Sequence, residues 1–514
     1  MRADATRADA TRADATRAEA AGLAGLAGLA PIDGASRLLD HGMTGLRRVV
    51  LEVAAGGLRA ADPGSAVDRL VEVEGSFLRA GGRCFDLDAA RSVVVLGAGK
   101  ASLPIAAALE RKLGDKLSGG LIVHRRGAAN GLSRIEVIDA DHPVPTTASL
   151  EAARRLAELA DGLGDGDLVI TAFTGGSSAL VCMPPEGVPF AAKQQLHSLL
   201  LDSGASIAEV NTVRKHVSAL KGGRLAQRLG AAAILNLTVS DVVTDAVDLL
   251  CDPTVQDTTS TAAAIAVLER YGLWPQVAPQ VRRHLLGQQS ESPSLQGSDI
   301  TTVVLIAGSG VLEQMAQRVR ELGWRPVILG PAIEGDAASV GGFLGALAAE
   351  SSARGRPFAP GSVLLGAGEV TVAIRRPAGS GTGGAGTGGA GTGGAGAGGA
   401  GAGRGGPNQE AALGFARPLA REPTAVAGAF LDSDGSDGGT DAAGGCVDST
   451  TAARAGEIRL DLDAAITGHD STQALRLLDD LVCTGPTGTN VSDLWVIAID
   501  AAERYHGVPQ AAAP

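Results

Sequence analysis

Aromatic side chains are scarce in this sequence: Phe, Trp and Tyr together make up 3% of the 514 residues. Because 45% of the chain is nonetheless hydrophobic, we expect sizeable cores built mainly from Val, Leu and Ala. Cysteines number five, an odd count at wide spacing with no Cys-x-x-Cys pair. This pattern argues against a disulfide framework and a structural zinc site, and it favours a reducing, cytoplasmic environment.

Long apolar runs and an excess of positive charge are also absent. No stretch has 18 consecutive apolar residues and the N-terminus has no apolar signal core, so we expect neither a membrane span nor a secretion signal. The net charge of −12 disfavours nucleic acid or an anionic membrane as the main partner. It still permits a local cationic pocket for a phosphorylated ligand.

Two segments are too repetitive to build a core. Residues 2–19 repeat a five-residue unit that matches no helical period, and we predict a disordered tail over 1–34. Residues 379–403 are Gly/Ala/Thr repeats, which predict a flexible insertion in a loop. We divide the remainder into a first α/β domain at 35–286 with helices over 36–80, a linker at 287–298, a second α/β domain at 299–506 and a tail at 507–514.

Strand, glycine turn and helix recur between residues 92 and 254, which predicts a parallel sheet with helices on both faces. The apolar run 92–96 leads into Gly97-Ala98-Gly99-Lys100, and the run 167–173 leads into the turn 174–178. Such turns aim backbone N–H groups and a helix N-terminus at an anion. Lys100 opposes the helix dipole, which is unfavourable unless an anion binds there. Neither a P-loop nor a dinucleotide fingerprint is complete, and a structural turn is the alternative.

Cations and acids follow closely in the segment 211–254. Arg214 and Lys221 are seven residues apart, so a continuous helix would place them on one flank, and Gly222-Gly223 would end that helix. Asp241 and Asp245 come after the apolar run 231–239, at a strand end where ligands of open α/β sheets bind. Cations for phosphate beside acids for Mg²⁺ are typical of phosphoryl-transfer sites. The alternative is a solvated basic helix followed by an ordinary strand and loop.

The segment NTVRKHxSxxKGGRLA, followed by a strand and SDVxxDxxxxxxDPT, resembles the glycerate 2-kinase family, whose C-terminal part is called the MOFRL domain. The resemblance covers roughly residues 36–497 with one large interruption. It implies an α/β protein with a Rossmann-like N-terminal domain and a second, MOFRL-type α/β domain. It also implies ATP-dependent, Mg²⁺-assisted phosphorylation of D-glycerate to 2-phosphoglycerate.

Further motifs carry the same resemblance, and each has a structural alternative. The acids at 434, 437 and 441 alternate with glycine, as in a loop for a hard cation or an acidic surface loop. Glu369 is predicted to bind a metal or ribose or else to cap a turn, and His142-Pro143 favours a rigid turn. Arg404 matches the first arginine of the family segment GRGGRNQE, whereas Pro407 stands where the family has the second. If the second arginine is the active one, its charge is missing here.

The candidate residues fall into three groups. Those for catalysis are Lys100, Arg214, Lys221, Asp241 and Arg404; those for substrate or nucleotide are Gly97, Gly99, Thr174, Gly175, Gly176, Ser177, Ser178, Asn211, Lys215, Glu369, Asn408, Gln409, Glu410, Thr487, Gly488, Thr489 and Asn490; those for Mg²⁺ are Asp241, Asp245, Asp434 and Asp437.

Two other functions stay open at this point. The Gly-x-Gly turn permits an NAD(P)H-dependent hydroxypyruvate reductase, although residues 117–123 lack the acid expected for ribose. Pro407 and the insertion permit a degenerate protein that only binds a phosphorylated metabolite. The sequence does not fix the oligomeric state, and a homodimer is compatible with it.

Overall fold

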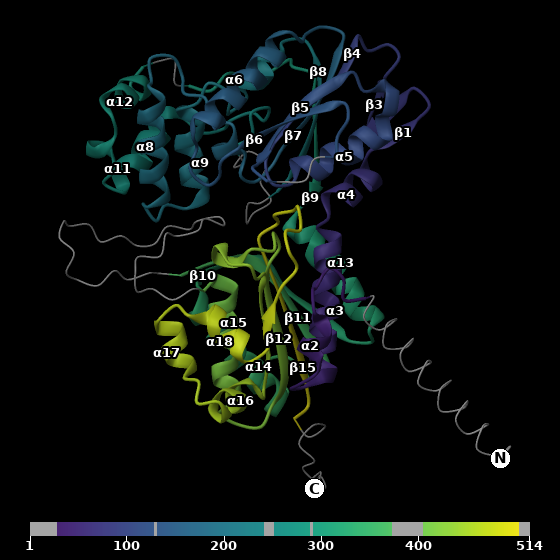
Figure 1. Ribbon diagram of the computed structural model, residues 1–514, viewed down its shortest axis with the longest axis vertical. Helices are drawn as coiled ribbons and strands as arrows, with labels where there is room; N and C mark the ends of the chain where they lie inside the picture. The colour runs from purple at the N-terminus through teal and green to yellow at the C-terminus, as the bar shows by residue number, and fades with distance from the viewer. Residues whose placement is uncertain (1–27, 128–130, 241–250, 288–290, 373–404, 503–514) are drawn as a thin grey trace, which may run out of the picture.

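The computed structural model describes residues 28–127, 131–240, 251–287, 291–372 and 405–502, which form two α/β lobes around two six-stranded sheets. Figure 1 shows the lobe of the first sheet above the lobe of the second. Asp241, Asp245, Arg404 and the insertion 379–403 lie outside the described residues.

The first sheet is parallel throughout, with strand order β6-β5-β4-β7-β8-β9. Its strands are β4 (Ser92–Ala98), β5 (Gly119–Arg125), β6 (Ile135–Ala140), β7 (Asp167–Phe173), β8 (Ala233–Val239) and β9 (Ile300–Ile306). Counted along the chain this is the 3-2-1-4-5-6 order of Rossmann-type sheets, in which ligands bind where the order reverses. The predicted Rossmann-like lobe is confirmed, and β4 and β7 flank its switch point.

Alternation along β4 explains why both faces of this sheet are covered. Val93 and Val95 pack in the core cluster that contains the apolar face of α5 (Ser102–Leu113). Val94 and Leu96 pack in a second cluster with α6 (Thr147–Asp161). Since side chains alternate along a strand, the two helices cover opposite faces of the sheet.

Further elements complete the first lobe. They are α4 (Pro63–Leu70), α7 (Ser177–Leu180), α8 (Phe190–Leu201), α9 (Ile207–His216), α10 (Arg224–Leu229), α11 (Thr261–Arg270), α12 (Pro279–Leu285) and the antiparallel strands β1 (Glu72–Glu74), β2 (Phe77–Ala80) and β3 (Arg83–Asp86). Helices α8, α9, α11 and α12 share an apolar cluster of their own, so they form a helical unit beside the sheet. The predicted helical reading of 36–80 is wrong over 72–80, where glycine turns at 75 and 81–82 connect short strands.

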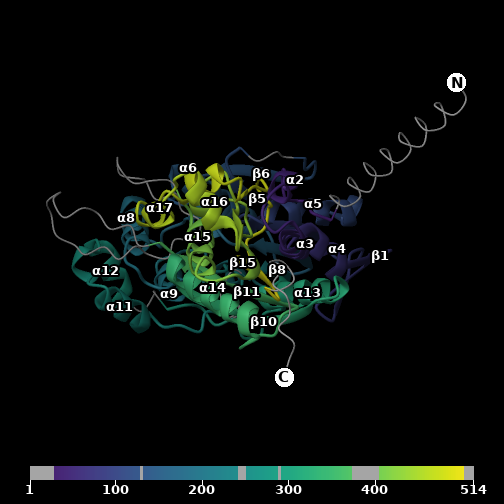
Figure 2. The ribbon, with the colours of Figure 1, turned by 90° about the horizontal axis from the view of Figure 1, so that it is seen from below.

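The second sheet is mixed, with order β10-β11-β15-β12-β13-β14. Its strands are β10 (Arg325–Asp336), β11 (Ser362–Thr371), β12 (Ala425–Asp432), β13 (Gly444–Asp448), β14 (Leu481–Val482) and β15 (Asp493–Asp500). Its helices are α2 (Ala35–Leu39), α3 (Thr44–Ala60), α13 (Gly308–Glu321), α14 (Ala337–Arg354), α15 (Pro407–Leu419), α16 (Thr451–Glu457), α17 (Leu462–Thr467) and α18 (Ser471–Leu477). Figure 2 shows α3 and α13 on one side of β11 and β15, with α14 and α15 on the other.

Two segments belong to a different lobe from the one predicted. Strand β9 pairs with β8, so residues 300–306 complete the first sheet instead of beginning the second block. Helix α3 packs on β12 and β15, so residues 44–60 belong to the second lobe and not to the first. Residues 28–34 join it there, since Leu29 and Ile32 are buried and Asp33 N donates to Cys483 O at 2.8 Å. Local patterns do not reveal such long-range pairing.

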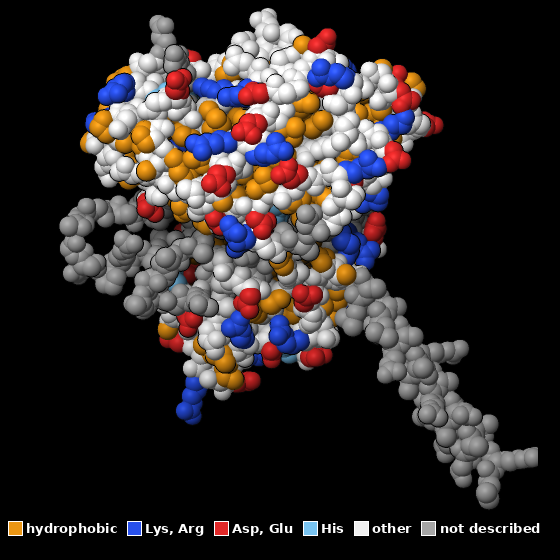
Figure 3. All heavy atoms as spheres, turned by 45° about the horizontal axis from the view of Figure 1, so that its top comes forward, with side chains coloured by type: hydrophobic (Ala, Val, Ile, Leu, Met, Phe, Trp, Pro, Cys, Tyr) orange, Lys and Arg blue, Asp and Glu red, His pale blue; other side chains and the backbone are white. Residues whose placement is uncertain are grey.

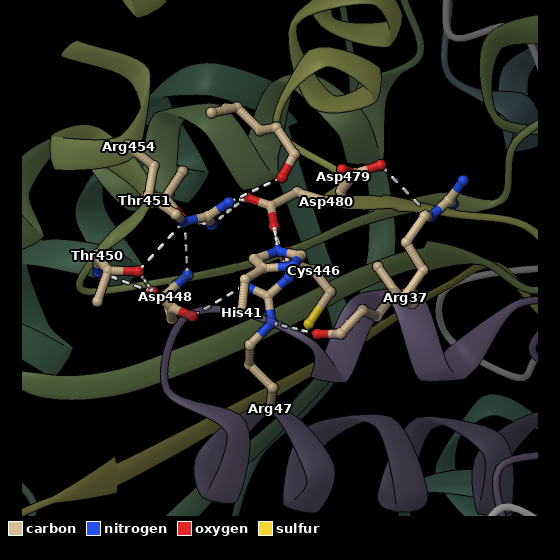
Figure 4. Close-up of polar contacts among 12 residues, drawn as sticks. Arg37, His41, Arg47, Cys446, Asp448, Thr450, Thr451, Arg454, Asp479 and Asp480 are labelled. Carbon is tan, nitrogen blue, oxygen red and sulfur yellow. Dashed lines mark hydrogen bonds and ion pairs between the residues drawn. The ribbon is translucent and has the colours of Figure 1, made fainter. Parts of the chain in front are cut away.

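A buried guanidinium ties α3 to the second sheet (Figure 4). Arg47 is fully buried, and its Nη1 donates to Asp448 Oδ2 at 2.9 Å while Nη2 donates to Asp480 Oδ1 at 2.5 Å. Arg454 Nη2 donates to the other oxygen of Asp480 at 2.7 Å, and His41 Nε2 lies 2.8 Å from Oδ1. Burial opposes ionisation of Asp448, but the charge and bonds of Arg47 outweigh it and lower the pKa of that carboxyl.

Side chains of both charge signs are interspersed on the face shown in Figure 3, with apolar atoms between them. None of the described helices combines the length and apolar composition needed to cross a bilayer. All five cysteines are free thiols.

Replacing Arg47 with Met should lower the free energy of unfolding by about 3–5 kcal/mol, because it leaves the buried Asp448 carboxylate without its cation and removes one of the cations bound to Asp480. Urea unfolding followed by circular dichroism measures this change. Arg79→Met is the control, because Arg79 and Glu74 form an exposed pair and the loss should be about 0–1 kcal/mol. Equal small losses for both variants would contradict the role of the network.

Candidate active site

Two glycine turns meet at the switch point of the first sheet. Gly99 has φ +126, and a Cβ there would lie 2.3 Å from Thr174 Oγ1, so only glycine permits this approach. Lys100 N donates to Gly175 O at 2.9 Å, and Ala101 N donates to Thr174 Oγ1 at 3.1 Å. These bonds lock the turn after β4 to the turn after β7.

The same bonds correct part of the predicted anion cradle. The backbone N–H groups of Lys100 and Ala101 donate within the paired turns, and Ser177 N donates to Thr174 O at 3.1 Å. They are therefore not available to a ligand as the structure stands. Gly97 lies inside β4, where a Cβ would meet Ala172 O at 2.4 Å, so this glycine serves strand packing. The turns act mainly by positioning side chains.

Lys100 reaches across to the second lobe. Its Nζ lies 2.5 Å from Oδ2 of Asp434, in the loop that follows β12. Both side chains are largely shielded, with 22% and 10% of their surface exposed. A second loop joins them, because Thr487 N donates to Asp434 O at 3.2 Å and Gly488 lies against Pro104 of α5. The predicted residues Lys100, Asp434 and Thr487 are thus brought together between the lobes.

Positive charge gathers on the first-lobe side of this junction. His142 packs on Gly176, where a Cβ would lie 3.3 Å from its Cδ2. Burial, followed by the nearby charges of Lys100, Arg125 and Arg214, lowers the pKa of His142 to about 4. The imidazole is therefore neutral at neutral pH, and the edge of the sheet is electropositive.

The continuous helix predicted from Arg214 to Lys221 is wrong, because α9 ends at His216. Val217 leaves helical geometry, and Ser218 Oγ accepts from the N–H groups of Leu220 and Lys221, both at 3.2 Å. Arg214 and Lys221 nevertheless line one small cavity together with Ser178. Lys221 is buried and donates to Val181 O at 2.8 Å, so it does not contact the Lys100–Asp434 junction directly.

Two other residues of this segment have internal partners. Lys215 is buried in an ion pair with Asp257 at 2.6 Å, which fastens α9 to the loop 252–259. Asn211 is buried and its Oδ1 accepts from Arg214 Nη1 at 3.4 Å, so it orients that guanidinium. Lys215 is thus paired with Asp257 in this structure, and its contact with a ligand stays a prediction.

Asp437, a predicted metal ligand, caps α15 instead. Its carboxylate accepts from the backbone N–H groups of Asn408 and Gln409 at 3.0 and 2.9 Å, and burial raises its pKa to about 7. Asn408 also donates through Nδ2 to Asp493 Oδ1 at 2.6 Å and accepts from Trp495 Nε1 at 2.9 Å. Asn408 and Gln409, which match the family motif, therefore hold the loop of Asp437 in place against α15.

The remaining second-lobe candidates surround this loop. Glu410 Oε1 lies 2.7 Å from His469 Nδ1, and burial raises the pKa of Glu410. Glu369 is partly buried on β11, and its negative charge contributes to the raised pKa of Asp493. Thr489 is buried, and Asn490 is partly buried beside it.

Two carboxylates escaped the sequence analysis. Asp432 ends β12 and Asp493 begins β15, and these residues are paired partners in the sheet. Burial, reinforced for Asp432 by the charges of Asp434 and Asp493, raises the pKa of both well above the usual range. Strand ends of this kind could be recognised only once the pairing of β12 with β15 was known.

His142 gives a pH-dependent prediction. Its pKa is about 4 in the folded chain against 6.5 ordinarily, so its contribution to stability is complete above pH 6.5 and is lost as the pH falls to 4. The wild type should therefore lose up to about 3 kcal/mol more than His142→Gln between pH 7 and pH 4. Urea unfolding at both pH values measures the difference, and parallel losses in the two proteins would contradict it.

Comparison with known proteins shows which family models and relatives this chain matches. The domain of unknown function DUF4147 matches residues 49–286, and the MOFRL family matches residues 395–493. A glycerate 2-kinase from Pyrococcus horikoshii is 36% identical over 464 residues, covering 89% of this chain and 98% of the relative. A relative from Agrobacterium vitis, provisionally named a hydroxypyruvate reductase, is 36% identical over 458 residues, covering 88% and 94%.

The fold is also found in a solved structure. The crystal structure of a glycerate kinase from Thermotoga maritima has a TM-score of 0.72 and 31% identity, and the match covers 88% of this chain and 99% of that one. The two lobes of this chain therefore both have counterparts in the Thermotoga maritima structure, over most of the length of each chain. This chain belongs to the glycerate kinase family, with its DUF4147 and MOFRL domains.

Proposed function

We propose that this protein transfers the terminal phosphoryl group of ATP to the 2-hydroxyl of D-glycerate, giving 2-phosphoglycerate and ADP. The observation that carries the proposal is the placement of Lys100 at the switch point of a parallel sheet, facing the Asp434 loop of the other lobe. The relatives named as glycerate kinases support the same substrate and phosphate donor.

In this proposal, charge compensation comes from the first lobe. Lys100 binds the transferred phosphoryl group, and Arg214, which shares the electropositive edge, balances further phosphate or carboxylate charge. The bond from the terminal phosphorus to the bridging oxygen of ADP breaks as the 2-hydroxyl oxygen bonds to phosphorus. A nearby carboxylate accepts the hydroxyl proton. Lys100 must then exchange Asp434 for the phosphate when ligands bind.

Magnesium fits the acidic side of the junction. Within the described ranges no three acidic, His or Cys side chains form a ready metal cage, but Mg²⁺ commonly uses one or two carboxylates plus substrate phosphates. Asp432 and Asp434 are the described residues that would hold it, because their mutual repulsion and burial favour a cation. When bound, the ion would neutralise charge on the phosphates. Asp241 and Asp245 stay predicted ligands outside the described residues.

One observation keeps a reductase as the second candidate. The 3-2-1-4-5-6 order and the Gly-x-Gly turn also suit a dinucleotide, and the Agrobacterium vitis relative carries that provisional name. Against it, β5 ends in His124 and Arg125, where an NAD site has an acid. Oxidation of NADH or NADPH on addition of hydroxypyruvate would favour this candidate, and an unchanged nicotinamide absorbance would exclude it.

Kinase activity is tested with purified protein, ATP, Mg²⁺ and D-glycerate in a coupled ADP-release assay. Phosphorus NMR of the product should show 2-phosphoglycerate. Formation of 3-phosphoglycerate would contradict the proposed acceptor hydroxyl. Thermal stabilisation by ATP without ADP release would instead indicate a binding protein that has lost catalysis. Pro407→Arg would then restore turnover if the missing arginine is the cause.

Lys100→Ala should lower kcat/KM at least ~100-fold, or about 3 kcal/mol, because the transferred phosphoryl group loses its cation. Lys116→Ala is the matched control, since Lys116 pairs with Asp88 on the exposed surface and should leave kcat/KM unchanged. Comparable turnover by Lys100→Ala and wild type would remove Lys100 from the active site.

A further inference from the structure

His142 lies at the edge of the first sheet where the two glycine turns meet. It follows β6, and a Cβ at Gly176 would lie 3.3 Å from its Cδ2 and 3.4 Å from its Nε2. The same Cβ would lie 3.8 Å from Lys100 Cγ. The space above Gly176, which the side chain of a larger residue would occupy, is therefore bordered by the Nε2 edge of the imidazole and by the stem of Lys100.

The loop that carries His142 is held on both sides of the ring. Before it, Asp141 Oδ2 accepts a hydrogen bond from Thr146 Oγ1 at 2.6 Å, at the start of α6. After it, Pro143 O lies 3.0 Å from Nε2 of His197 on α8. Because two helices fix the backbone on either side, the position of the imidazole is set before a ligand arrives.

The imidazole itself has no hydrogen-bond partner among the residues that the structure describes, although its neighbours in the loop do. A neutral imidazole has one N–H donor and one acceptor nitrogen, so both are left for a ligand or water. The other histidines in the described ranges each have at least one ring nitrogen within hydrogen-bond distance of a protein oxygen; they are His41, His124, His197, His216, His284 and His469.

The charges around the ring favour an anionic ligand. Burial, followed by the charges of Lys100, Arg125 and Arg214, lowers the pKa of His142, whereas the charge of Asp434 raises it. These groups belong to the turn after β4, the end of β5, α9 and the second lobe. The imidazole is therefore neutral at neutral pH, and its N–H lies among cations that also attract an anion.

We propose that His142 is a substrate-binding residue, whose Nε2–H donates a hydrogen bond to an anionic oxygen of a substrate, either the carboxylate of D-glycerate or a phosphate of ATP. The bond forms above Gly176 and beside Lys100. This inference rests on the proposed kinase function, and it adds a neutral donor to the cations already assigned there.

Steady-state kinetics of His142→Leu test the contact. The KM of one substrate should rise on the order of 10- to 100-fold, because a hydrogen bond to a charged oxygen is lost. The KM of the other substrate should stay close to that of the wild type, and the affected substrate identifies the source of the anionic oxygen. His142→Gln should recover most of the lost affinity, because its amide N–H reaches the position of Nε2.

His142→Asn is the matched control, because its amide reaches only the position of Nδ1 and should not restore the KM. Unchanged KM values for His142→Leu would overturn the inference. Equal rises in both KM values for the Leu, Asn and Gln variants would also overturn it, because they would show that the ring only packs against Gly176.

NMR of the wild type gives a readout that needs no turnover. Isotope-labelled histidine reports each imidazole, and loss of a signal in His142→Gln assigns His142. Its Nε2 signal should shift when D-glycerate or Mg²⁺-ATP is added alone. A wild type that releases no ADP would contradict the kinase proposal, and the shift would still decide the role of His142. An unchanged signal with both substrates would overturn the inference.

Discussion

The close approach of two turns at the switch point is the constraint on which the candidate site depends. Strands β4 and β7 are neighbours and parallel, yet their following helices lie on different faces of the sheet. The two turns therefore begin at adjacent strand ends and lead to opposite faces of the sheet. They can pack against each other because Gly99 has no Cβ. The bonds between Lys100, Ala101, Thr174 and Gly175 fix the backbone of Lys100, and with it the origin of its side chain.

The second lobe completes the site because the chain passes between the lobes more than once. Helix α3 lies in the second lobe and is held there by Arg47, whereas the first sheet runs from β4 to β9 and α13 then returns to the second lobe. Asp434 can face Lys100 only if the two lobes keep this arrangement. The stability of the buried Arg47 network and the geometry of the Lys100–Asp434 junction are therefore linked through the fold, although they share no residue.

Local sequence patterns were sufficient to predict the elements whose structure depends on neighbouring residues in the chain. The apolar strands at 92–96 and 167–173, the glycine turns after them and the cation at Lys100 all lie where the pattern predicted. The patterns failed where the role of a residue depends on a partner that is distant in the sequence. Nothing near Asp437 indicates that it caps α15, nothing near Lys215 indicates Asp257, and Asp432 becomes notable only beside Asp493. A hydroxyl at Ser218 ended the helix that periodicity would have continued to Lys221.

The most direct test of the account is a crystal structure with D-glycerate, Mg²⁺ and a non-hydrolysable ATP analogue. We predict that the terminal phosphate lies within hydrogen-bond distance of Lys100 Nζ, beside the turn 174–178, with the 2-hydroxyl of glycerate facing the phosphorus. Lys100 should have left Asp434 to make this contact. An analogue bound elsewhere, with the Lys100–Asp434 pair intact, would contradict the assignment of this junction as the site of phosphoryl transfer.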